Sequence, residues 1–340
     1  MSTPSSAPSA TATRAVVPTT HPPLLGFGIV LGAAALFGTL GPLSRFAYEA
    51  GMEPGAFVAW RAMVGLIGLG LYVAWRVRRG ATKLVRLGDL PGRTCTMLLV
   101  AAVVGFTLNL AMFIAFDRIT VALALLGFYT YPAMVAAVNM VLGRERLDRT
   151  RSVALALAIL GMVAVVASQL DPDGGIRLDA IGIGLALGAA VSQTVFVVIS
   201  RDGYPEVPTA QATMVVLLVT VVCSIGLAAV TGSAASIVYP LSTPSVLPLL
   251  LFTGIFAAAI PSLGFLTGIR TIGGTRAGIL MLFEPVVGVA LAAGLLGEAL
   301  VPIQALGAAA ILAAAVVLQR AARGPEADSD AGAVVASGGL

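Results

Sequence analysis

Histidine and cysteine are almost absent from the chain. The one histidine, His21, lies in an N-terminal segment rich in serine, threonine and proline, and the two cysteines are Cys95 and Cys223. A chain without a histidine in its apolar segments lacks a Ser-His-Asp set and a zinc hydrolase motif. Two cysteines in or beside apolar runs predict neither a disulfide framework nor a cysteine-based metal site. We therefore expect no metal and no cofactor.

Charged residues are also scarce. They make up 11% of the 340 residues, while 58% are hydrophobic and the mean hydropathy is +1.00. A soluble domain is about 25% charged, so this composition excludes one. A bilayer core needs about 20 apolar residues per helix. Ten runs of suitable length occur, at residues 24–47, 55–75, 96–116, 119–141, 152–169, 179–200, 209–231, 246–269, 275–296 and 301–319.

These runs predict an all-α integral membrane protein with ten spans whose main partner is the lipid bilayer. Residues 1–23 and 324–340 lack apolar periodicity and are expected to be disordered, which leaves two folded units at 24–170 and 178–320. The glycine-rich stretch GIGLALG at 182–188 is no nucleotide signal, because no strand precedes it and no Walker lysine follows it. ATP coupling is not expected.

The distribution of lysine and arginine predicts the orientation. With the N-terminus inside, sixteen of the 20 basic residues fall in inner segments and three in outer ones, namely Arg45, Arg118 and Arg177. Cytoplasmic loops collect basic residues. We therefore expect a multi-pass protein of the inner cell membrane with both termini in the cytoplasm. The basic loops need no nucleic-acid partner to explain them.

Two segments of the chain resemble each other at a constant offset of 153 residues. The segment beginning ITVALALLGFYTYP at Ile119 aligns with IGGTRAGILMLFEP at Ile272, so that Pro132 meets Pro285 and Glu145 meets Glu298. The chain thus divides into halves of five spans each. Because five is odd, the second half enters the membrane from the opposite side. Inverted repeats favour alternating access to a site near the midplane, which indicates a carrier rather than an enzyme.

At these residues the chain resembles the EamA domain of the drug/metabolite transporter superfamily. The motif of a proline followed thirteen residues later by a glutamate, a short turn and an alanine-rich closing helix occurs twice. The segment from Ile269 to Glu298 is similar to the threonine/homoserine exporter type. The resemblance implies secondary transport of small solutes such as amino acids, metabolites or drugs. It also implies a cavity bounded by spans one, three, four, six, eight and nine.

Glu284 is the one acidic residue inside the ninth span. A charge at the centre of a span costs about 2.5 kcal/mol or more, so it faces a cavity, pairs with a cation or is protonated. Pro285 removes a backbone donor beside it and, like Pro132 in the other repeat, is expected to break the helix. Two interpretations stay open: Glu284 binds a substrate amine or a proton, or it is structural and pairs with Arg61 or the interrupted backbone.

Five further polar residues in the spans are candidate binding residues. Arg61 either snorkels to the membrane surface, pairs with Glu284, Glu49 or Glu53, or attracts an anionic group. Asn109 and Gln193 are mid-span and either contact substrate or join helices, as Asn139 near a helix end is expected to do. Tyr129 and Tyr131 lie on different faces, and Tyr131 is the better candidate because it aligns with Glu284. Glu145 and Glu298 are predicted to be structural helix ends.

These patterns predict a secondary transporter that exports small organic solutes, with protons exchanged at Glu284. Two alternatives share the fold: a lipid-precursor flippase, which would need a lateral opening between helices, and a passive facilitator, which would survive loss of Glu284. An integral-membrane enzyme would need acids or histidines clustered at one interface, and the sequence has no such cluster.

Overall fold

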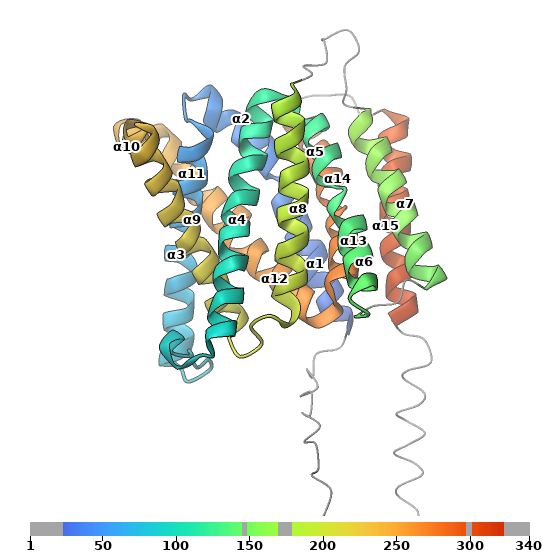
Figure 1. Cartoon of the computed structure of the whole chain (residues 1–340). Helices are drawn as coiled ribbons and strands as arrows, with labels where there is room; N and C mark the ends of the chain where they lie inside the picture. The colour runs from blue at the N-terminus through green and yellow to red at the C-terminus, as the bar shows by residue number, and fades with distance from the viewer. Residues whose placement is uncertain (1–22, 145–147, 169–178, 297–300, 323–340) are drawn as a thin grey trace, which may run out of the picture.

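The structure is a computed structural model, and it describes residues 23–144, 148–168, 179–296 and 301–322. All the elements in these ranges are helical, and ten helices are long and apolar enough to cross a membrane (Figure 1). The prediction of an all-α protein with ten spans is therefore confirmed. The predicted arms at 1–23 and 324–340 fall, apart from Pro23, outside the described residues, as do Glu145 and Glu298.

Several spans contain more than one helix. The first half consists of α1 Pro23–Gly38, α2 Leu40–Glu49, α3 Pro54–Arg78, η1 Leu87–Asp89, α4 Gly92–Arg118, α5 Val121–Phe128, α6 Tyr131–Val141 and α7 Arg149–Ala167. The second half consists of α8 Ala180–Asp202, α9 Thr209–Thr231, α10 Ala234–Ser242, η2 Pro244–Val246, α11 Leu247–Gly254, η3 Ile255–Ala259, α12 Ile260–Ile272, α13 Gly274–Met281, α14 Glu284–Leu296 and α15 Pro302–Ala322.

The two proline-containing spans break at equivalent positions. Helix α5 ends and α6 begins on the two sides of residues 129–130. Helix α13 ends and α14 begins on the two sides of residues 282–283, which is the same place at the offset of 153. Pro132 and Pro285 each lie in the first turn of the second helix of the pair, where the missing N–H costs no intrahelical bond. The predicted helix breaks are thus present in both repeats.

Other irregular segments were not predicted. The first span is interrupted at Thr39, between α1 and α2, and the eighth contains the π-helix η3. The segment between spans seven and eight forms α10, where we expected a loop. Tyr239 of α10 donates a hydrogen bond to the Ala50 carbonyl, and Trp60 of α3 donates one to the Ile237 carbonyl (2.7 Å). Helix α10 thus connects the second half to the first.

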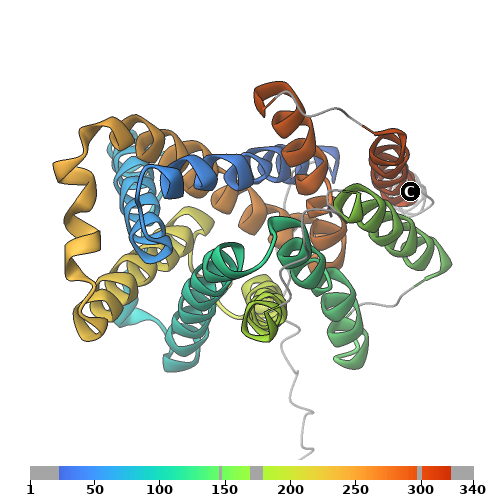
Figure 2. The same cartoon turned by 90° about the horizontal axis from the view of Figure 1, so that it is seen from above.

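The closing helices of the two repeats, α7 and α15, pack side by side at one edge of the bundle, opposite α9 and α10 (Figure 2). Gly161 and Gly307 face each other where they cross. A Cβ on Gly161 would lie 2.6 Å from the Gly307 carbonyl oxygen, and a Cβ on Gly307 would lie 2.5 Å from that of Gly161. Small residues permit such close backbone approach in membranes.

We expect Gly161→Ala to destabilise the protein by about 1–3 kcal/mol, because the added methyl forces α7 and α15 apart. The melting temperature of detergent-solubilised protein measures this effect. Gly188→Ala in α8 is the control, since its Cβ would have no neighbour within 4 Å. Equal melting temperatures for the two variants would contradict a tight crossing at Gly161.

Candidate functional site

A cavity of about 580 Å³ lies between the two halves of the bundle. It is lined by all six spans that the resemblance implied, and also by spans two and seven through Arg61 and Thr213. Arg45 of α2 and Thr120 before α5 also line it, at the end of the bundle that faces away from the first turn of α1 (Figure 1). The cavity therefore extends from the middle of the bundle to the end opposite the termini of the helical part.

Glu284 lines this cavity as the first residue of α14. The helix break at residues 282–283 separates Glu284 from α13 and places it at the N-terminus of α14. An acidic side chain at a helix N-terminus is stabilised by the helix dipole. The Tyr129 hydroxyl is the polar side chain nearest to the Glu284 carboxyl, no cation of the described residues forms an ion pair with that carboxyl, and the residue is half-buried. The carboxyl is therefore available to a ligand or a proton that enters the cavity.

Three aromatic side chains lie beside the acid. Phe128, Tyr129 and Tyr131 line the cavity, with ring centroids 5.2–6.4 Å apart. The Tyr129 hydroxyl faces the Glu284 carboxyl but has no hydrogen-bond partner of good geometry among the described residues. Tyr131 donates a long hydrogen bond to the Gly278 carbonyl (3.5 Å). Both tyrosines thus reach the cavity, although the helical spacing had placed them on different faces.

Arg61 lies deep in the cavity wall and is only 5% exposed. Its Nη1 donates to the Ala257 carbonyl (3.0 Å), its Nη2 donates to Asn109 Oδ1, and its guanidinium lies 5.0 Å from the centroid of Phe113. The Ala257 carbonyl belongs to the π-helix η3. Arg61 therefore neither snorkels nor forms the ion pair with Glu284, Glu49 or Glu53 that was one alternative; neutral acceptors hold it instead.

We expect Arg61→Lys to lose about 1–3 kcal/mol of stability, because one ammonium cannot reach both acceptors and leaves a buried one unpaired. Thermal unfolding in detergent measures the loss. Arg79→Lys is the matched control: Arg79 is exposed and lies over the Trp75 ring at 4.4 Å. An Arg61→Lys protein as stable as the control would contradict the role of the two hydrogen bonds.

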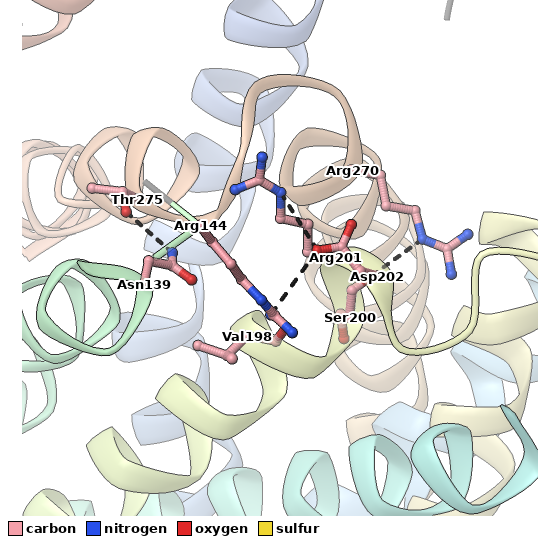
Figure 3. A network of polar contacts seen from close by, with 8 residues as sticks. All are labelled: Asn139, Arg144, Val198, Ser200, Arg201, Asp202, Arg270 and Thr275. Atoms are coloured by element: carbon pink, nitrogen blue, oxygen red, sulfur yellow. Dashed lines mark hydrogen bonds and ion pairs between the residues drawn. The ribbon is translucent and has the colours of Figure 1, made fainter. Parts of the chain in front are cut away.

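Of the three amide side chains considered from the sequence, two line the cavity and one joins two helices outside it. Asn109 and Gln193 both line the cavity, and Asn109 also donates to the Gly105 carbonyl (2.8 Å). Asn139 lies outside the lining and donates to Thr275 Oγ1 of α13 (3.3 Å; Figure 3). Asn139 thus joins two helices, as its position near a helix end predicted.

The chain matches the EamA-like transporter family over residues 24–167 and again over 180–320. It belongs to this family. Membership identifies a multi-pass membrane transporter of small solutes of the drug/metabolite type. A search of curated proteins found no match. Among 29 matching chains of solved structures, one described as "Crystal structure of protein" has a TM-score of 0.70 at 20% identity and covers 89% of this chain and 100% of its own. That likeness supports the fold.

In this EamA-like transporter, a network of polar contacts joins α12 to α8 at the end of the bundle where α8 ends, which we call the closed end (Figures 1 and 3). Arg270 of α12 donates to the carbonyls of Ser200 (3.3 Å), Tyr204 (3.2 Å) and Val207 (2.8 Å). Its guanidinium lies 4.9 Å from the centroid of the Tyr204 ring. Burial raises the pKa of the Tyr204 phenol, which therefore stays neutral. Arg270 thus ties α12 to the segment between α8 and α9.

A second arginine, Arg144, extends the closure from the end of α6. It donates to the Val198 carbonyl (3.0 Å) and lies 4.0 Å from Asp202. From the sequence, Arg144 and Arg270 were interpreted only as basic residues that set the topology. A charged residue within a turn of a predicted span end was the available signal, but it is shared by most basic residues here.

An ion pair links two helices near the cavity mouth. Arg118 Nη1 lies 2.7 Å from Asp179 Oδ2, so the end of α4 is joined to the start of α8. This hydrogen bond holds the pKa of Asp179 below its ordinary value. The Asp179 carboxylate also caps α8 by accepting from the Ile181 N–H (2.9 Å). Arg118 and Asp179 thus join the end of α4 to the start of α8.

Proposed function

We propose that the protein exports small organic solutes, with amino acids and related amines as the main class, by alternating access coupled to proton exchange at Glu284. The observation that carries this proposal is a carboxyl that has no ion-pair partner among the described residues and lies in a cavity lined by both inverted repeats. A carboxylate in such a site attracts either a proton or a substrate ammonium. Because the two compete, loading one releases the other.

The remaining cavity residues fit a small solute that carries both apolar and polar groups. Phe128, Tyr129 and Tyr131 offer ring faces to a cation or an apolar side chain. Asn109 and Gln193 offer neutral hydrogen-bonding groups. With the basic residues placed inside, both termini are cytoplasmic and the cavity opens outward, in the inner cell membrane. This is the release state of an exporter.

An untargeted comparison of metabolites tests the function without a prior choice of substrate. Cells with and without the protein are compared for solutes inside and outside. We expect one or a few amines to accumulate inside cells that lack it and to appear in the medium when it is produced. A change confined to lipid precursors would favour a flippase. Flux that does not saturate and survives loss of Glu284 would favour a passive facilitator.

A further inference from the structure

The closed end of the cavity is formed by α6 packing along α13. Tyr131 donates to the Gly278 carbonyl, and Asn139 Nδ2 lies 3.3 Å from Thr275 Oγ1. A Cβ on Gly278 would lie 3.4 Å from the Tyr131 ring and 3.6 Å from the Pro132 Cα. These contacts join α6 to α13 from the helix break at Tyr131 to Asn139, near the end of α6.

The inverted repeat gives every part of this contact a counterpart. At the offset of 153, α6 corresponds to α14 and α13 corresponds to α5, and the starts of all four helices agree with this offset. In the present state α14 and α5 do not form the extended contact that α6 and α13 form. Leu125 of α5 and Gly288 of α14 both line the cavity instead. Inverted repeats allow the halves to exchange conformations, which would close the open end as the other end opens.

We propose that the open end closes by the repeat-related contact, with α14 packed along α5, and that it does so only when the Glu284 carboxyl carries no charge. This proposal rests on the proposed function, since it supplies the coupling rule for the same site. In the contact, Glu284 takes the place that Tyr131 has now, and Leu125 takes the place of Gly278. Positions 122 and 292 take the places of Thr275 and Asn139.

The chemistry of this exchange sets the charge requirement. The Tyr131 hydroxyl donates to the Gly278 carbonyl, and Tyr131 is only 1% exposed. In the repeat-related contact, the Glu284 carboxyl would lie against the Leu125 carbonyl. A carboxylate can only accept hydrogen bonds, whereas a protonated carboxyl can donate one. A buried carboxylate facing a carbonyl oxygen is strongly destabilised, so the charged form prevents closure.

The other groups that face Glu284 do not remove this restriction. Tyr129 and Tyr131 carry phenols, which are uncharged at neutral pH. Arg61 is already held by the Ala257 carbonyl and Asn109, and Arg45 lies at the cavity mouth. Neutralisation therefore comes from the cavity, by a proton taken from hydronium, which leaves water, or by a substrate ammonium. The empty, charged carrier cannot switch, and this is the condition for exchange of solute against proton.

Cysteine pairs at the two ends test the proposal. Ala122→Cys with Ala292→Cys reports the proposed contact, and Asn139→Cys with Thr275→Cys reports the one that exists now. Both pairs are placed in a protein whose Cys95 and Cys223 are replaced by alanine and are oxidised in membranes across a pH series. We expect cross-linking of the 122–292 pair to rise as the pH falls, by up to about tenfold per pH unit, while the 139–275 pair cross-links less.

The matched variant is Glu284→Gln, which mimics the uncharged carboxyl. In it the 122–292 pair is expected to cross-link strongly at every pH. Thiolate supply falls with pH and so opposes the expected rise, and the Gln variant corrects for it. A single Leu125→Cys gives a second readout without a pair: its reaction with a water-soluble thiol reagent is expected to fall as the open end closes.

Three outcomes overturn the proposal. The first is an absence of 122–292 cross-linking in Glu284→Gln together with an unchanged Leu125→Cys reaction. The second is a pH dependence in the Gln variant equal to that of the parent. The third is cross-linking that does not change with pH in the parent. A protein that moves no solute but shows the expected cross-linking contradicts the proposed function and leaves the closing contact intact.

Discussion

Glu284→Gln is expected to abolish solute accumulation driven by a pH difference. In proteoliposomes with the membrane potential held at zero, one-for-one exchange of an ammonium and a proton gives about tenfold accumulation per pH unit, since a tenfold ratio equals about 1.4 kcal/mol. The amide cannot release a proton, so the variant should show a ratio of about one. Binding of a substrate ammonium is expected to weaken as well.

The control for this measurement is a neighbouring cavity residue that does not titrate. Gln193→Ala changes the wall of the same cavity, so it should alter the transport rate but keep the dependence on the pH gradient. Full gradient dependence in Glu284→Gln would contradict proton exchange at this carboxyl. An unchanged elution profile in detergent confirms that each variant is folded.

Arg270→Met is expected to loosen the closed end. The substitution removes the donor shared by the carbonyls of residues 200, 204 and 207, and an unpaired buried acceptor costs about 1–3 kcal/mol. Val197→Cys reports the change, because Val197 is buried and lies against Gly274 of α13. We expect its reaction with a water-soluble thiol reagent to accelerate at least about tenfold, the ratio that corresponds to 1.4 kcal/mol.

Arg86→Met provides the control for a lost positive charge, since Arg86 is exposed near the same end of the bundle. It should leave the Val197→Cys reaction unchanged. If Arg270→Met behaves like Arg86→Met, the closed end does not depend on Arg270. A fast reaction in both variants would point to general loosening by charge removal and would also contradict the specific role.

The features that depend on composition and on proline could be predicted from the sequence. The spans follow from apolar length, and the breaks before Pro132 and Pro285 follow from a missing donor. No proline lies at the break at Thr39 or within the π-helix at Ile255–Ala259. In the π-helix, the Ala257 carbonyl accepts a hydrogen bond from Arg61 of another span. The hydropathy of a segment does not indicate that one of its backbone carbonyls accepts a hydrogen bond from a side chain of another span.

The cavity was predicted in the same uneven way. Glu284, Asn109 and Gln193 were singled out because a polar side chain in an apolar run needs a partner or a cavity, and all three line the cavity; their role in binding stays a prediction. The role of Arg270 was missed, because its partners are backbone carbonyls almost seventy residues earlier in the chain. Tyr129 was ranked below Tyr131 by repeat alignment alone, whereas it is the tyrosine whose hydroxyl faces Glu284.

In the proposed alternating-access cycle, helix α10 would make the two access states unequal in energy. It lies between spans seven and eight, while the corresponding segment of the first half has only the short η1. The hydrogen bonds from Tyr239 to the Ala50 carbonyl and from Trp60 to the Ile237 carbonyl join α10 to the first half at the open end. A carrier with such a bias rests with its site facing one compartment. The apparent affinity for the same solute is then higher from that side, because binding from the other side must first populate the rarer state.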